Sequence, residues 1–90
     1  MALLDLLGRR WALRVIWELR EEPLLFRSLQ ARCEGMSSSV LNQRLQELRV
    51  AGIVELAGGG YQLTTEGRRL AEAYPALDEW AERWADRVRE

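Results

Sequence analysis

Hydrophobic residues recur along this chain with a helical period, except in one short segment near residue 60. Between residues 9 and 22, apolar side chains surround a narrow polar stripe, which predicts a helix covered on more than one side. Pro23 ends this helix, because proline lacks the amide hydrogen that a helix interior requires. A short leucine-rich segment at residues 3–7 precedes the helix and stops at Gly8.

The middle of the chain predicts two helices joined by a turn. Residues 26–34 follow a short extended piece at residues 23–25 and have a mixed but broadly helical pattern. Ser37 is a natural N-cap for the second helix, because a serine oxygen accepts backbone amide hydrogens two and three residues further on. Gly52 is the matching C-terminal stop, so the second helix covers about residues 37–51.

The pattern then changes to alternation at residues 53–56 and 61–64, which predicts a β-hairpin closed by the intervening AGGG turn. Thr64 or Thr65 caps a further helix, and Pro75 either kinks that helix or starts a new one. One face of the final segment is apolar and carries Leu77, Trp80, Ala81, Trp84 and Val88.

This order of elements predicts a mainly α-helical fold with a small β-hairpin, arranged as a winged helix-turn-helix. Ninety residues are enough for one domain, and no linker, internal repeat or low-complexity tract divides the chain. We therefore expect a single winged helix-turn-helix domain over residues 1–90.

The predicted helix at residues 37–51 carries amides on its outer face, where Glu and Lys are more usual. At about 100° per residue, Leu41, Leu45 and Leu48 point to the core. Ser, Asn and Gln side chains both donate and accept hydrogen bonds, and so match base edges in a DNA major groove. On an isolated helix these residues would form a polar solvent face, but a position after a helix-turn-helix favours DNA readout. The residues expected to contact DNA from this helix are Ser37, Ser38, Ser39, Asn42, Gln43 and Gln46.

Charge is unevenly distributed, although the net charge of the chain is −1. Residues 1–52 carry eight arginines against six acids, a balance of +2, whereas residues 53–90 carry five against eight, a balance of −3. All 13 basic residues are arginines, which suit bidentate contacts to phosphate or guanine. Arg44 lies beside the apolar face, where an internal ion pair is an equal alternative to a phosphate contact. The cations available near the predicted DNA-contacting helix are Arg27, Arg32, Arg44 and Arg49.

The composition argues against catalysis and against a bound metal or cofactor. The chain has no histidine and one cysteine, which leaves the common catalytic triads and zinc sites without their usual residues. The carboxylates fall at helix-surface spacings among arginines, as expected for solvated faces. Cys33 occupies an inward position, so we interpret it as a buried structural thiol in preference to a redox sensor. With neither a run of roughly 18 apolar residues nor a signal peptide, we expect a cytoplasmic protein without a membrane partner.

Six motifs occur in order along the chain: LLGRRW at 6–11, FRSL at 26–29, MSSSVLNQRLQEL at 36–48, AGIVE at 51–55, LTTEG at 63–67, and Trp80 in the final helix. Together they resemble those of the HxlR-type transcriptional regulators, a winged helix-turn-helix family related to MarR. The resemblance implies a bacterial or archaeal regulator that binds double-stranded operator DNA as a homodimer.

In that family the dimer forms mainly through the terminal helices, which implies a dimerisation layer of residues 1–22 and 65–90 in this chain. A two-fold dimer presents two DNA-contacting helices roughly 34 Å apart and so matches a palindromic operator. Tryptophans are favoured anchors in interfaces, although Trp80 and Trp84 have the alternative of capping the protein's own core. The expected interface residues are Leu3, Leu4, Leu7, Trp11, Leu77, Trp80, Trp84 and Val88.

Three features depart from the family pattern. The hairpin tip has Leu56, Ala57 and three glycines without a single cation, which leaves its minor-groove contact open. Leu25 stands where the family often has arginine, and no cysteine precedes the first helix as in redox-sensing members. The alternative is therefore a winged-helix protein interaction module with weak or no DNA binding. The sequence identifies no small-molecule or redox effector.

Overall fold

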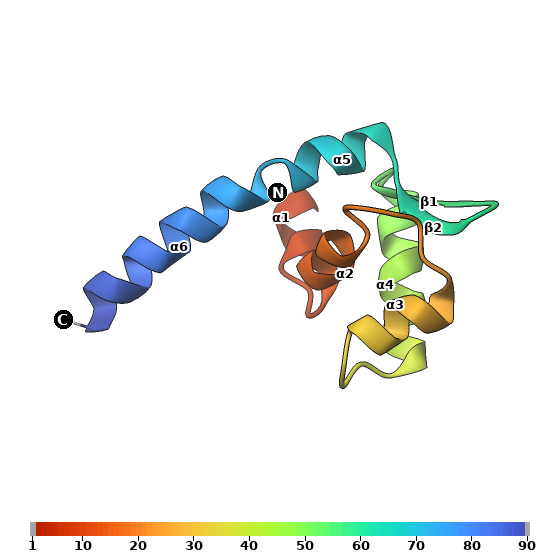
Figure 1. Cartoon of the computed structure of the whole chain (residues 1–90), viewed down its shortest axis with the longest axis horizontal. Helices are drawn as coiled ribbons and strands as arrows, with labels where there is room; N and C mark the ends of the chain where they lie inside the picture. Colours follow the sequence, from red (N-terminus) through yellow and green to blue (C-terminus); the bar gives the residue numbers. More distant parts are fainter. Residues whose placement is uncertain (1, 90) are drawn as a thin grey trace.

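The computed structural model describes residues 2–89, with side chains from Asp5 to Arg89. Its elements are, in order, α1 (Ala2–Leu7), α2 (Ala12–Glu18), α3 (Phe26–Arg32), α4 (Ser38–Val50), β1 (Val54–Ala57), β2 (Gly60–Leu63), α5 (Thr65–Ala71) and α6 (Tyr74–Arg89). The two strands form one antiparallel hairpin (Figure 1). The predicted fold is confirmed: α3 and α4 are the helix-turn-helix, and the hairpin is the wing.

The hydrophobic core fixes α4 by its inner face. Leu41, Leu45 and Leu48 are almost fully buried, as their helical spacing predicted. Truncating one such leucine to alanine in a packed core costs about 2–5 kcal/mol of stability. Buried residues of the neighbouring elements complete the same cluster, among them Val15, Ile16, Leu19, Leu29, Val54 and Leu63. The outer face of α4 is left to the solvent.

Local chemistry defines both ends of α4, as the sequence predicted. The Ser37 hydroxyl oxygen accepts the Val40 backbone amide at 3.2 Å, which satisfies one of the free donors of the first turn. At the other end, Gly52 has a φ of 76°, a left-handed conformation that favours glycine. The Ile53 amide then donates to the Leu48 carbonyl at 2.9 Å and closes the helix.

The wing is anchored to the extended segment that precedes α3. Ala57 pairs with Gly60, so the turn is only residues 58–59, and each strand is displaced by one residue from its predicted bounds. Gly60 has a φ of 116°, and a Cβ there would lie 2.5 Å from the Leu24 carbonyl oxygen. This close approach lets Leu24 exchange two backbone hydrogen bonds with Tyr61, at 2.9 and 2.8 Å. The predicted extended piece before α3 is therefore a β-bridge to the wing.

The helix predicted at residues 9–22 is shorter at both ends. Trp11 has a φ of 78°, and a left-handed residue cannot continue a right-handed helix, so α2 begins after it. At the far end, the Trp17 carbonyl accepts both the Arg20 backbone amide at 3.2 Å and the Arg20 side chain at 2.9 Å, and these bonds close the last turn. α3 likewise ends at Arg32, earlier than predicted, with its cap at Cys33.

The C-terminal part consists of two helices that meet at a break. Thr64 caps α5, because its hydroxyl oxygen accepts the Gly67 amide at 3.0 Å. Pro75 is the second residue of α6, so it starts a new helix and does not kink the preceding one. α6 projects away from the rest of the molecule, on the side opposite the wing (Figure 1). Within residues 2–89, no helix is both long and apolar enough to span a bilayer.

Candidate nucleic-acid interface

The outer face of α4 gathers the polar side chains that the sequence singled out. The hydrophobic side of this helix faces the core, and the opposite side is exposed. We call the exposed hydroxyls and amides of this side the amide face; its members are Ser38, Ser39, Asn42, Gln43 and Gln46. The first turn begins at Ser37, whose hydroxyl oxygen caps the helix and lies 3.3 Å from that of Ser39.

The amides of this face are free to bind a partner. In the described part of the chain, hydrogen bonds from side-chain amides involve only Gln30 and Gln62. Asn42, Gln43 and Gln46 therefore keep their full donor and acceptor capacity. An amide that is unpaired and exposed can form the two hydrogen bonds that adenine presents in the major groove.

The amide face stands as a ridge between two shallow grooves. One groove, of about 520 Å³, lies against α1 and Arg9. The other, of about 410 Å³, lies against Tyr61 of the wing. Gln46 and Val50 line both grooves, so they lie on the crest between them. A projecting helix of this kind has the shape that a major groove, roughly 12 Å wide, admits.

Of the four predicted phosphate-binding arginines, two are exposed and unpaired. Arg27 of α3 and Arg49 of α4 form no ion pair with any residue that the structure describes. Arg32 is held loosely, because its guanidinium lies 3.2 Å from Glu22 and both side chains are about half exposed. An exposed pair of this kind contributes little to stability, so Arg32 can exchange Glu22 for a phosphate.

Arg44 forms the internal ion pair that the sequence offered as the alternative to a phosphate contact. Its side chain is only 13% exposed, and its Nη1 lies 2.7 Å from Glu47 Oε1. Its Nε donates to the backbone carbonyl of Arg10 at 2.8 Å, which joins α4 to the segment before α2. Because two of its three guanidinium nitrogens are engaged inside the molecule, the structure favours the internal ion pair over a phosphate contact for Arg44.

The sequence interpretation missed Arg9 as a cation of this surface. Its Nε lies 3.1 Å from Glu47 Oε2, and its side chain is 51% exposed at the edge of the first groove. Arg9 and Arg44 both pair with Glu47, and Asp5 lines the same groove, so the charges on this flank of the amide face balance. The available signal was the GRR sequence between two helical segments.

Cys33, in the turn before α4, is fully buried, as predicted. Burial raises the pKa of its thiol, and the nearby Arg14 guanidinium lowers it in part. A protonated, buried thiol is a poor nucleophile and a poor metal ligand. Across the described residues, no three potential metal-ligating side chains lie together.

A second exposed surface is apolar and lies on α6. Leu77, Trp80, Trp84 and Val88 are each more than half exposed, and the rings of the two tryptophans stack with centroids 6.2 Å apart. None of residues 74–89 is buried, so the alternative that these tryptophans cap the protein's own core is wrong. We call these four side chains the α6 stripe.

The predicted N-terminal interface residues have a different environment. Leu7 and Trp11 are partly buried and pack against the protein's own core, while the side chains of Leu3 and Leu4 lie outside the described ones. Two apolar residues that the prediction omitted, Leu13 and Trp17 of α2, are more than one third exposed. They line a groove between α2 and α6, of about 670 Å³, which reaches Leu77 at the start of the α6 stripe.

Known proteins match both the sequence and this arrangement. The sequence model of the HxlR-like helix-turn-helix family matches residues 6–89. The HTH-type transcriptional regulator YvaP of Bacillus subtilis is 29% identical over 89 residues, which cover 91% of this chain and 82% of that protein. The quinone-bound structure of YodB from Bacillus subtilis superposes with a TM-score of 0.86 at 30% identity, over 91% of this chain and 93% of that one.

A candidate HxlR family transcription factor of Thermoplasma volcanium superposes with a TM-score of 0.79 at 27% identity, over 97% of this chain and 84% of that one. These matches extend from α1 to α6 and include both the helix-turn-helix and the wing. The resemblance drawn from the six sequence motifs is thereby confirmed. The chain belongs to the HxlR-like helix-turn-helix family and is a transcriptional regulator of that type.

Proposed function

We propose that this regulator binds a palindromic operator in double-stranded DNA sequence-specifically, as a homodimer. The observation that carries the proposal is the amide face: a capped helix in the second position of a helix-turn-helix, with three unpaired amides on its outer side. Recognition helices of this class read base edges from the major groove. Family membership supports DNA binding in general, and the amide face adds the means of reading sequence.

The side chains divide into those that read bases and those that fix the position of the helix. Asn42, Gln43 and Gln46 contact base edges in this proposal, and the serines at the N-terminal end contact bases or phosphates. Arg27, Arg49 and, after leaving Glu22, Arg32 contact phosphates. The wing tip carries no cation between Leu56 and Gly60, so it adds no charged minor-groove contact.

The homodimer is proposed to form through the α6 stripe, within a layer that includes residues 1–22 and 65–90. Four large apolar side chains that remain more than half exposed on one helix face favour burial against another surface. A second copy supplies an identical stripe, and a two-fold axis then pairs the two recognition helices for a palindrome.

The test is selection of labelled random duplexes by the purified protein, followed by fluorescence anisotropy of the selected sequence across a salt series. Enrichment of an inverted repeat, with affinity that falls as salt rises, is the expected result. Light scattering on the same sample measures the mass of the free protein and of its complex. Enrichment of a single, unrepeated half-site would contradict the proposal that the operator is palindromic.

The second candidate function is a protein interaction module with weak or no DNA binding. The uncharged wing and the exposed α6 stripe favour it. Absence of binding to any duplex at the lowest salt would decide for this alternative, because even nonspecific binders retain electrostatic affinity there.

A further inference from the structure

α6 has little to hold it in place along most of its length. The helix has 16 residues, none of them buried, and it projects from the body (Figure 1). The groove of about 670 Å³ beside Leu13 and Trp17 separates its first turns from α2. The direction of α6 is therefore decided close to its first residue, Tyr74.

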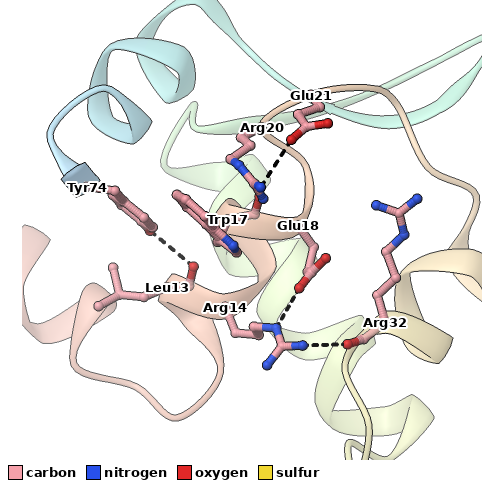
Figure 2. Close-up of polar contacts among 8 residues, drawn as sticks. All are labelled: Leu13, Arg14, Trp17, Glu18, Arg20, Glu21, Arg32 and Tyr74. Atoms are coloured by element: carbon pink, nitrogen blue, oxygen red, sulfur yellow. Dashed lines mark hydrogen bonds and ion pairs between the residues drawn. The ribbon is translucent and has the colours of Figure 1, made fainter. Parts of the chain in front are cut away.

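Tyr74 contacts α2 in two ways. Its ring stacks on the Trp17 ring, with centroids 5.7 Å apart and planes only 4° from parallel. Its hydroxyl donates a hydrogen bond to the Leu13 carbonyl oxygen at 3.1 Å, across 61 residues of sequence (Figure 2). The stack fixes the plane of the Tyr74 ring, and the hydrogen bond fixes its rotation within that plane.

Trp17 is itself fixed on its other side. The Arg20 guanidinium lies 3.6 Å from the Trp17 ring centroid, and Figure 2 shows the indole between Arg20 and Tyr74. Arg20 is in turn held by the Trp17 carbonyl at 2.9 Å and by Glu21 at 3.1 Å. The three stacked layers connect α6 to α2, whose Ile16 is in the core with α4.

We propose that Tyr74 is a positioning residue for operator recognition, because its contacts with Trp17 and Leu13 set the angle at which α6 leaves the helix-turn-helix body. The inference rests on the proposed function, in which two copies join through the α6 stripe. In such a dimer, the angle at Tyr74 determines how far apart the two amide faces lie.

The geometry makes this angle consequential. A helix of 16 residues is roughly 24 Å long, so a change of about 10° at its start moves its far end by about 4 Å. That displacement exceeds the rise of one base pair, roughly 3.4 Å. A loosened Tyr74 therefore lets the dimer accept operators whose half-sites are one base pair closer or further apart.

The first test measures the angle directly. Nitroxide labels on Glu82→Cys in α6 and Ser28→Cys in α3 report their separation by electron spin resonance, because both positions are exposed and the native Cys33 is fully buried. An excess of unlabelled protein restricts the signal to distances within one protomer. The variants are Tyr74→Ala, which removes stack and hydrogen bond, and Tyr74→Phe, which removes only the hydrogen bond.

The second test uses DNA. Operators with half-sites moved by one base pair in either direction are compared with the selected operator and with an isolated half-site. We expect Tyr74→Ala to reduce the preference for the best spacing by about fivefold or more, at unchanged half-site affinity. A merely destabilised protein would instead lose half-site affinity. Glu79→Gln, on the exposed surface of α6 and outside the α6 stripe, is the matched control, expected to behave as the parent.

The expected result is a narrow distance distribution in the parent and in Glu79→Gln, a broader one in Tyr74→Phe and the broadest in Tyr74→Ala. Equal distributions in the folded parent and Tyr74→Ala, or an unchanged spacing preference, would overturn the inference. A monomeric parent without an operator would overturn the proposed dimer and its spacing, a failure that light scattering distinguishes from an unchanged α6 angle.

Discussion

Arg44 and Glu47 form an ion pair of 2.7 Å one turn apart on α4, at a point where the same carboxylate also meets Arg9. The pair is mostly shielded from solvent, because the two side chains are only 13% and 23% exposed. Arg44 also donates to the Arg10 carbonyl, so it joins the recognition helix to the segment that precedes α2. The pair therefore holds α4 in place beneath the amide face.

Arg44→Ala should lower the free energy of unfolding by about 1–3 kcal/mol, because it leaves the Arg10 carbonyl without this donor and the mostly buried Glu47 carboxylate with Arg9 alone. Urea denaturation measures this. The matched control is Arg69→Ala, which breaks an ion pair of the same sequence spacing whose side chains are 69% and 71% exposed. Its cost should stay within about 0.5 kcal/mol. An equal loss of unfolding free energy in the two variants would show that burial does not make the Arg44–Glu47 pair more stabilising than the exposed pair.

Gln43→Ala should weaken binding to the selected operator by about 1–3 kcal/mol and leave binding to random DNA nearly unchanged. The reason is that a base-reading amide adds affinity only where its base is present. Fluorescence anisotropy on both duplexes measures the difference. The control is Gln62→Ala, which removes an amide that is already bonded to Glu55 on the wing. A uniform loss on both duplexes would argue against base readout by Gln43.

Trp84→Ala should weaken self-association by about 2 kcal/mol, roughly 30-fold in the dimer dissociation constant, as expected for an interface tryptophan. Because Trp84 is 54% exposed, the thermal stability of the monomer should not fall with it. Analytical ultracentrifugation over a concentration series gives the constant. Arg83→Ala changes the preceding residue, outside the α6 stripe, and should associate like the parent. Unaltered association of Trp84→Ala would remove the α6 stripe from the interface.

Burial raises the pKa of Tyr74 to about 12 from its ordinary value near 10. The folded state then holds this proton more tightly than the unfolded state, so the stabilisation is complete below about pH 10 and is lost as pH rises toward 12. The test is ultraviolet titration of the phenolate in a Tyr61→Phe background, where Tyr74 is the only tyrosine. A native midpoint equal to that in denaturant would contradict the buried environment.

Cys33 should react with a thiol reagent only when local or global unfolding of the protein exposes it. Burial raises the pKa of the thiol, so both the thiolate fraction and the access of the reagent are low. We expect the native rate to be at least roughly 100-fold below the rate in denaturant, with the difference set by the free energy of opening. Ser28→Cys, on an exposed surface of α3, provides the reference for an accessible thiol. Comparable rates at the two positions would show that Cys33 is accessible.

Local chemistry in the sequence predicted the recognition helix well. Ser37 and Gly52 define its ends through bonds to residues within a few positions, and the leucine period defines its buried side. The start of α2 could not be predicted in the same way, because nothing in the local pattern requires the left-handed conformation of Trp11.

Long-range contacts account for the rest of what the sequence left out. Arg9 pairs with Glu47, 38 positions further along the chain, and Tyr74 stacks on Trp17, 57 positions before it. A helical period relates only residues within a few turns, so it cannot predict contacts at these sequence separations. The helical spacing did predict that Arg44 lies between the buried and the exposed side of α4. Its hydrogen bond to the Arg10 carbonyl could not be predicted, because it depends on how the segment before α2 packs against α4. These contacts arise only once the helices are assembled.

The two-residue turn of the wing separates two properties that many DNA-binding proteins combine. Gly58 has open space around it and a Cβ at Gly59 would make only ordinary contact with Pro23, whereas Gly60 is confined by Leu24, so the tip can be altered without disturbing the strands that carry it. Arginines grafted onto an extended tip would strengthen binding to every sequence alike, since phosphate contacts carry no base information. In this scaffold, the affinity for DNA of any sequence can therefore be adjusted at the wing tip while the base-reading side chains of the amide face stay unchanged.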